Sequence, residues 1–349
     1  MLWNDFDARG EGKKRGVKMN GAKTDRSGTH GAGTHTTGPQ VADGTAPDRS
    51  IRRRGFLGLL VTAGAVMATE GCVTITPVTA TGDFPVASGV QIDSPTFVRM
   101  RQRNQGKGQV IVGVKDDQPG LGYLDPATRT YSGFDIEIAW LVAAGLGFDQ
   151  DQVEFVTVET HNRESALMNS SVDLVIATYS YTAARATEVS FAGPYYKTGE
   201  GLLVRQSDTT TSGLSSLTPG NTVCSVTASS PLAELPSLTS ARITAADDYS
   251  ECLSQVSQGQ ATGLYTDLPI LAGYAAEYPG RYRVMPINDH QPDQLYGIGV
   301  LHGDTGLITK IDDILKTAEA NGTWLAIFNA TLAASGLTAP TPPPIGEWD

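Results

Sequence analysis

The chain contains few of the residues that are typical of metal sites or of nucleophilic catalysis. It has three cysteines and five histidines among 349 residues, and no spacing among them matches a zinc site. A G-x-S-x-G nucleophile elbow and a G-x-x-x-x-G-K-[ST] phosphate loop are both absent from the sequence. Residues 106–108 (GKG) come before a predicted strand rather than after one, so they do not form a dinucleotide-binding turn. These absences predict a protein that needs no metal or cofactor and binds a molecule without transforming it.

An apolar run near the N-terminus is too short to cross a membrane. Residues 55–68 (GFLGLLVTAGAVMA) are uncharged, but 14 residues are fewer than the roughly 20 that a spanning helix needs. The length is typical of the apolar region of a signal peptide, and residues 53–57 (RRGFL) resemble a twin-arginine export signal. Cys72 follows Gly71 and resembles the cysteine at which bacterial lipoproteins are cleaved and lipidated, although Glu70 departs from that pattern.

The leader therefore predicts the cellular location. We expect residues 52–71 to be a signal peptide and Cys72 to carry a lipid that anchors the protein to the extracellular face of the cell membrane. The alternative is an ordinary buried core helix, which the basic residues before the run disfavour. Export by the twin-arginine or the general route is left open.

The distribution of charge agrees with this division. Residues 1–71 carry a net charge of +4 and the remainder −15, within a total of −11. An acidic mature protein argues against nucleic acid as a partner. We expect a disordered extension over residues 1–51, a tether over 72–108 and a disordered tail over 334–349, where residues 338–344 contain four prolines.

Lipidation of Cys72 would leave two cysteines, Cys224 and Cys252. In an oxidising compartment an even pair predicts a disulfide, and two buried free thiols are the alternative.

Strand and helix patterns alternate through residues 109–333. Buried-strand patterns separated by amphipathic helices predict parallel sheets that are covered on both faces. The alternation runs through twice, which predicts two α/β lobes and a hinge cleft between them, where ligands usually bind. The expected boundaries are residues 109–204 for lobe 1, 205–295 for lobe 2 and 296–333 for the return to lobe 1.

Several segments between residues 110 and 332 resemble one family in the order in which they occur. They are VIVGVKDDQPGLGY, GFDIEIA, HNRESAL, VDLVIATYSYTAAR, SFAGPYY, VCSV, YSEC, YTDLPILAGY and YGIGV. The chain resembles the solute-binding proteins of polar amino-acid ABC importers, and among them the actinobacterial glutamate-binding lipoproteins. This resemblance implies a two-lobed type II periplasmic-binding-protein fold, closure of the lobes on an amino acid, delivery to ABC permease subunits, and a monomer.

The resemblance also implies the residues that hold the ligand's α-carboxylate. In the family an arginine follows a buried strand by about eight residues, and Arg185 occupies that position here. A guanidinium presents two parallel N–H donors to a carboxylate and stays charged. Thr178 and Ser180 lie at the carboxyl end of the strand, where open α/β sheets bind ligands. The alternative for Arg185 is a solvated charge at a helix end.

Lobe 2 is expected to supply the remaining contacts to the amino-acid backbone. Asp267, at the end of a predicted strand, matches the family's carboxylate for the ligand's ammonium, and it is also placed to cap the following helix. Ser229 and Ser230 stand where the family has a G-[ST]-T turn, with Ala228 in place of the glycine. Backbone N–H groups at the following helix start would add an anion cradle.

The side chain of the ligand is assigned less directly. Arg163, with Thr160 before it, resembles the segment that binders of acidic amino acids use for the side-chain carboxylate, which favours glutamate or aspartate over glutamine or asparagine. The alternative for Arg163 is a surface position on a helix. Lys115 and Asp116 follow the first strand and are expected to face the cleft, where either Lys115 would assist an acidic side chain or Asp116 would help to hold the ammonium.

Two other functions were weighed against that of an importer receptor. A sensory input module would have to signal through a separate partner. A dehydratase of cyclic acids on the same scaffold would need a carboxylic acid that protonates a leaving hydroxyl, and no glutamate at a strand end is suitably placed.

Overall fold

The computed structural model describes residues 82–287 and 293–348, all of which fall within the compact unit Gly71–Asp349. The predicted extension and signal peptide, Cys72 and the first part of the predicted tether lie outside the described residues.

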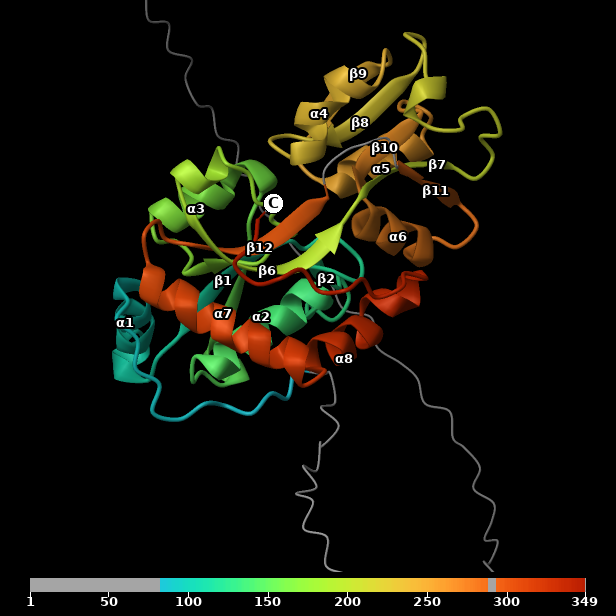
Figure 1. Cartoon of the computed structure of the whole chain (residues 1–349). Helices are drawn as coiled ribbons and strands as arrows, with labels where there is room; N and C mark the ends of the chain where they lie inside the picture. Colours follow the sequence, from blue (N-terminus) through green and yellow to red (C-terminus); the bar gives the residue numbers. More distant parts are fainter. Residues whose placement is uncertain (1–81, 288–292, 349) are drawn as a thin grey trace, which may run out of the picture. The chain divides into compact units, whose positions relative to one another are not determined.

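Lobe 1 is built on a five-stranded sheet with the strand order β4-β1-β5-β12-β6. In it, β1 pairs in parallel with β4 and β5, whereas β12 runs antiparallel to β5 and β6. Helices α2, α7 and α8 pack against one another beside this sheet (Figure 1). Its elements are α1 (Pro95–Gln102), β1 (Val110–Val114), β2 (Tyr123–Leu124), β3 (Tyr131–Ser132), α2 (Phe134–Gly145), β4 (Val153–Thr157), α3 (Arg163–Met168), β5 (Leu174–Val175), β6 (Ser190–Thr198), β12 (Gln294–Val300), α7 (Thr305–Ala320) and α8 (Thr323–Ala330).

Lobe 2 repeats the arrangement with the strand order β11-β7-β10-β8-β9. In it, β8 pairs in parallel with β9 and β10, and β7 runs antiparallel to β10 and β11. Its elements are β7 (Glu200–Arg205), β8 (Thr222–Val226), α4 (Ser230–Leu238), β9 (Arg242–Ala246), α5 (Tyr249–Ser257), β10 (Gly263–Asp267), α6 (Leu268–Glu277) and β11 (Tyr282–Ile287).

The two sheets share one topology. In each sheet, the strand that enters from the other lobe runs antiparallel to its two neighbours. In lobe 1, β12 lies between β5 and β6, and in lobe 2, β7 lies between β10 and β11. The chain crosses between the lobes twice, from β6 to β7 and from β11 to β12 (Figure 1). This architecture confirms the predicted α/β fold with two lobes of the type II periplasmic-binding class.

The lobe boundaries differ from those expected by a few residues. Strand β7 belongs to the lobe 2 sheet, although all of its residues except Arg205 were assigned to lobe 1, and β12 enters lobe 1 from Gln294 rather than residue 296. Because β6 and β7 are both buried almost throughout, hydrophobicity does not reveal which sheet either strand joins.

The tether was assigned too far along the chain. From residue 82 onward the segment is folded onto lobe 1, and Phe84, Phe97 and Met100 are buried in its core. Helix α1 begins at the N-cap Ser94, whose Oγ accepts a hydrogen bond from the Phe97 N–H. The scattered proline and glycine residues suggested a tether, but the widely spaced apolar side chains determine the structure.

The tail is folded as well, contrary to the predicted disorder over residues 334–349. The Trp348 ring stacks on Tyr181 with the ring centroids 4.8 Å apart, and the Gly346 N–H donates to the carbonyl oxygen of Gly193 over 2.7 Å. Leu337, Ala339 and Ile345 also pack against the core, so several contacts hold the segment against lobe 1.

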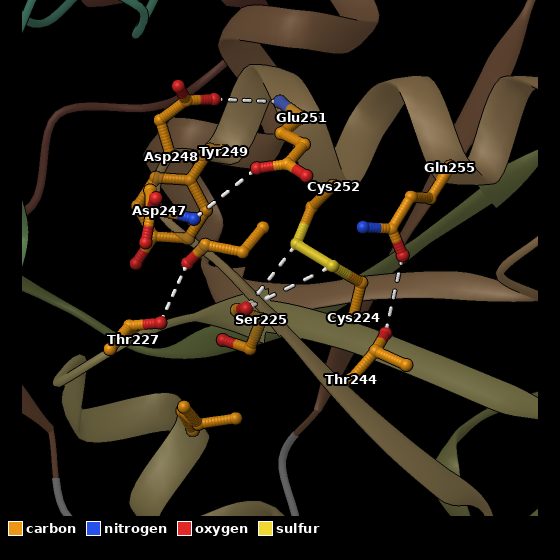
Figure 2. Close-up of a disulfide and its surroundings, with 12 residues drawn as sticks. Cys224, Ser225, Thr227, Thr244, Asp247, Asp248, Tyr249, Glu251, Cys252 and Gln255 are labelled. Atoms are coloured by element: carbon orange, nitrogen blue, oxygen red, sulfur yellow. Dashed lines mark hydrogen bonds between the residues drawn. A yellow bond between two sulfur atoms is a disulfide. The ribbon is translucent and has the colours of Figure 1, made fainter. Parts of the chain in front are cut away.

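A disulfide joins Cys224 in β8 to Cys252 in α5, which confirms the predicted pairing (Figure 2). The Cα atoms are 5.5 Å apart and the sequence separation is 28 residues. A loop of this length corresponds to roughly 3 kcal/mol of stabilisation in the chain-entropy model. In lobe 2 the disulfide therefore ties α5, which begins at Tyr249, to β8, the strand that precedes Ser229.

Candidate functional site

Ten residues from both lobes surround a small, narrow cavity. The lining residues are Thr160, Arg163, Thr178, Ser180 and Arg185 from lobe 1, and Ser229, Ser230, Pro231, Tyr249 and Asp267 from lobe 2. Eight of them had been selected from the sequence as ligand-binding residues. The structure therefore brings these eight together, although their binding roles stay a prediction.

Arg185 spans the gap between the lobes. Its Nη1 donates to the carbonyl oxygen of Ser180 over 2.6 Å and to Ser230 Oγ over 3.2 Å. Its Nη2 donates to the carbonyl oxygen of Ala228 over 2.8 Å. The alternative of a solvated helix-end charge is excluded, because the side chain is only 11% exposed. The acceptors from lobe 2 are uncharged, so a carboxylate entering the cavity would be a stronger partner for this guanidinium.

Glu164 and Tyr179, which do not line the cavity, contact the Arg185 side chain within lobe 1. Glu164 Oε1 lies 3.3 Å from Arg185 Nε and accepts a hydrogen bond of 2.7 Å from the Tyr179 hydroxyl. The Tyr179 ring lies 5.4 Å from the Arg185 guanidinium carbon. Burial, followed by the nearby Arg163 charge, lowers the pKa of Arg185 to about 10. The group is thus cationic at neutral pH and lacks full electrostatic compensation.

Arg163 is buried rather than on the surface, with 3% of the residue exposed. Its Nε donates to the carbonyl oxygen of Thr160 over 3.1 Å and its Nη1 to that of Ala177 over 3.2 Å. The guanidinium carbon lies 4.4 Å from the centre of the Tyr179 ring. The two arginines therefore contact one tyrosine ring and create a strongly cationic region in lobe 1.

Asp267 is the anionic counterpart in lobe 2. The residue is 3% exposed, and its Oδ2 accepts a 2.6 Å hydrogen bond from the Tyr296 hydroxyl. Its Oδ1 is buried and has no hydrogen-bond partner among the described residues. Burial is the main reason that the pKa of this carboxyl is raised to about 7. A buried, unpaired oxygen of this kind is a ready partner for a cationic group of a ligand.

This raised pKa predicts that ligand affinity depends on pH. A ligand ammonium that binds the Asp267 carboxylate would compete with a proton for that group below pH 7. We expect the association constant for an α-amino acid to fall about tenfold per pH unit as the pH drops from 7 to 5.5, and to change little between 7 and 7.5. Calorimetric titration over this range measures it. An affinity that is constant from pH 7.5 to 5.5 would remove Asp267 as the ammonium partner.

The lobe 2 wall of the cavity is the start of α4. Ser229 is the N-cap, and its Oγ accepts a 3.1 Å hydrogen bond from the Leu232 N–H. Ala228, immediately before it, adopts φ +60, a left-handed conformation that favours glycine. Ala228 stands where the family's G-[ST]-T turn has glycine, and its backbone conformation is one that suits glycine.

Asp116 was predicted to contact the ligand, but the structure places it elsewhere. Its Oδ2 accepts a 3.0 Å hydrogen bond from Thr157 Oγ1, and it does not belong to the described residues that line the cavity. Its neighbour Lys115 is buried, with Nζ 3.9 Å from Asp117 Oδ1 and 3.8 Å from Glu159 Oε2. Backbone alternation ceases after β1, so the sequence does not distinguish which of the paired aspartates turns inward.

Tyr249 was missed by the sequence analysis. It is the first residue of α5 and is 4% exposed. An aromatic residue in the first turn of an amphipathic helix is ordinarily a core residue, so the pattern contained no separate signal for a role at the cavity.

Within the described part of the chain, no helix has the length and apolar character needed to span a membrane. Over the same residues, no cluster of three or more His, Cys, Asp or Glu side chains is arranged to hold a metal ion.

Comparison with known proteins gives consistent results. The profile for bacterial extracellular solute-binding proteins, family 3, matches residues 110–332. The glutamate-binding protein GluB of Corynebacterium glutamicum is 36% identical over 233 residues, which cover 64% of this chain and 79% of the relative. The glutamine-binding protein GlnH of the Bacillus subtilis ABC transporter is 29% identical over 221 residues, covering 63% and 80%.

Solved structures agree on the fold. The solute receptor for L-cysteine of Neisseria gonorrhoeae superposes with a TM-score of 0.61 at 26% identity, covering 68% of this chain and 93% of that one. An ancestral arginine-binding protein bound to glutamine gives a TM-score of 0.59 at 24% identity, covering 64% and 97%.

Proposed function

Because the chain belongs to family 3 of the bacterial extracellular solute-binding proteins, we propose that it is the receptor that captures glutamate, or a close polar amino acid, for an ABC importer. The family consists of binding proteins, which confirms the prediction that the chain is not an enzyme. The proposal rests mainly on one observation: two arginines line the lobe 1 side of the cavity, and its lobe 2 side is lined by Asp267, whose Oδ1 has no hydrogen-bond partner among the described residues.

The geometry suggests how an amino acid is held. The α-carboxylate binds Arg185 and displaces the neutral oxygens of Ala228 and Ser230, with the N-terminus of α4 nearby. The α-ammonium donates to Asp267 Oδ1. Each end of the ligand is then bound by a different lobe, so the ligand bridges the cleft and stabilises the closed form.

The charges also suggest which side chain is accepted. Arg163 lies beside Arg185 on the Tyr179 ring. Glu164 faces Arg185 Nε, whereas the hydrogen bonds of Arg163 among the described residues go to backbone carbonyl oxygens of lobe 1. A second carboxylate on the ligand, as in glutamate or aspartate, would give Arg163 an anionic partner. The relatives GluB and GlnH are a glutamate-binding and a glutamine-binding protein, which supports this class of solute, acid or amide.

The expected affinity follows from the number of charged contacts. Each charge-assisted hydrogen bond contributes roughly 1.5–3 kcal/mol. Four or five of them, less the costs of ordering and desolvation, correspond to a dissociation constant in the micromolar range, about −8 kcal/mol.

Calorimetric titration with glutamate, aspartate, glutamine and asparagine tests the assignment, after bound ligand is removed by unfolding and refolding with the disulfide intact. We expect Arg163→Ala to weaken glutamate binding at least a hundredfold and glutamine binding less than tenfold, because only the acid needs a second cation. Arg242→Ala, at an exposed arginine in β9, is the matched control and should change neither. Tighter glutamine binding that does not depend on Arg163 would assign an amide ligand, and absence of heat with all four would refute the function.

The cellular location follows from the leader alone. We propose that the protein is exported and held as a lipid-anchored monomer on the outer face of the cell membrane through Cys72, from where it delivers its ligand to the permease. In cells, Cys72→Ala is expected to move the protein from the membrane fraction to the medium, whereas Cys72→Ala protein that stays in the membrane fraction would refute the anchor.

A further inference from the structure

Asp117, in the loop after β1, makes a set of contacts that the binding of a ligand does not explain. Its Oδ2 accepts hydrogen bonds from the backbone N–H groups of Tyr249 and Ser250, over 2.9 and 3.1 Å. Its carbonyl oxygen accepts a 2.6 Å hydrogen bond from the Tyr274 hydroxyl. Asp117 belongs to lobe 1 and all three donors belong to lobe 2.

The Asp117 carboxylate accepts hydrogen bonds from N–H groups at the start of α5 that have no acceptor within lobe 2 among the described residues. The first N–H groups of a helix have no intrahelical partner and carry partial positive charge. In α5 the N-cap Asp248 accepts from the third N–H, that of Glu251, over 2.7 Å. The first two N–H groups, of Tyr249 and Ser250, bond to Asp117 instead. The capping of this helix is therefore completed by the opposite lobe.

The same loop is seated directly on lobe 2. A Cβ atom at Gly273 in α6 would lie 2.0 Å from the carbonyl oxygen of Pro119, so the backbone of the loop touches the helix at a point where only glycine fits. The Asp117 side chain is 9% exposed, and Lys115 Nζ lies 3.9 Å from its Oδ1. The contact is thus close and largely buried, and Lys115 faces the carboxylate from within lobe 1.

We infer that Asp117 is a positioning residue that fastens lobe 2 to lobe 1 when the cleft is closed over the ligand. Tyr249 connects this contact to the cavity, because its N–H bonds to Asp117 while its side chain lines the site. A bond that exists only in the closed form raises the population of that form and slows the release of whatever it encloses. The inference rests on the proposed function, with L-glutamate as the probe.

Amide hydrogen exchange of the full-length protein tests the contact, measured with saturating L-glutamate, which closes the cleft, and again without ligand. Because the amides of Tyr249 and Ser250 have no partner within their helix, their protection reports Asp117 alone. We expect Asp117→Ala to speed exchange at both amides at least tenfold, and Asp117→Asn, which keeps an acceptor oxygen, to speed it less. Asp248→Ala is the matched control, since this aspartate caps the same helix from within lobe 2 and should affect chiefly the Glu251 amide.

Stopped-flow binding then tests the consequence for function. Asp117→Ala should raise the dissociation rate of L-glutamate at least tenfold and change the association rate less than threefold, and Tyr274→Phe should act in the same direction. Asp248→Ala, compared with Asp117→Ala at a temperature at which both variants are fully folded, should leave the dissociation rate of L-glutamate unchanged. Equal amide exchange in wild type and Asp117→Ala when both are saturated with glutamate, or equal glutamate release, would overturn the inference. If the wild-type protein binds no glutamate, the proposed function fails and the exchange rates alone decide whether the contact exists.

Discussion

Replacing Asp267 with asparagine is expected to weaken amino-acid binding by roughly a hundredfold to a thousandfold at pH 7.5. The substitution keeps the shape of the side chain and an acceptor for the Tyr296 hydroxyl, but removes the negative charge from the lobe 2 side of the cavity. A ligand ammonium would then be buried without a counterion, which costs several kcal/mol. Calorimetric titration with glutamate measures the loss.

The same substitution should leave the ligand-free protein as stable as before, or more stable. Burial raises the pKa of Asp267 to about 7, above its value in the unfolded chain, so ionisation of this group lowers the free energy of unfolding as the pH rises through 7. Asparagine has no such dependence. Urea unfolding at pH 7.5 checks this, and a large loss of stability in Asp267→Asn would mean that the carboxylate serves the fold rather than the ligand.

Replacing Arg185 with lysine should weaken binding about a hundredfold although the charge is retained. The guanidinium has two parallel N–H donors for a carboxylate, whereas an ammonium is a point charge on a flexible chain. Lysine would also lose the hydrogen bonds that Arg185 makes to Ser180 and Ala228, one on each side of the cleft. Titration with glutamate gives the change in affinity.

Glu164→Gln serves as the control for this variant. It removes the charge that faces Arg185 Nε but keeps an acceptor for the Tyr179 hydroxyl. We expect it to change affinity less than tenfold, because Arg185 remains in place. If Arg185→Lys binds glutamate as tightly as the wild type, paired donation from a guanidinium is not what holds the α-carboxylate.

The resemblance to the amino-acid-binding family was the source of the prediction for Arg185 and Asp267, whose binding roles stay a prediction. Asp267 ends β10 and Arg185 follows β5, one in each lobe, and the carboxyl ends of strands in α/β sheets converge on the cleft. The disulfide was predictable because an even pair of cysteines remained after Cys72. For Arg163 the sequence left a surface position open, which burial in the structure excludes.

Other features depend on tertiary contacts that leave little trace in a local pattern. Whether Asp116 or Asp117 turns toward lobe 2 depends on the conformation of a loop that has no period. Residues 82–108 and the C-terminal segment are folded onto lobe 1 through a few apolar side chains, such as Phe97 and Trp348. The composition around these side chains is typical of flexible chain, so the sequence did not predict that the segments are folded.

Binding of two truncated analogues of glutamate tests the central claim most directly. Glutarate lacks the α-ammonium and γ-aminobutyrate lacks the α-carboxylate, so each keeps only one of the two groups that Asp267 and Arg185 are proposed to hold. Calorimetric titration at pH 7.5 should show micromolar binding of glutamate and at least hundredfold weaker binding of both analogues. Glutarate that binds as tightly as glutamate would contradict the account, because Asp267 would then contribute nothing to recognition.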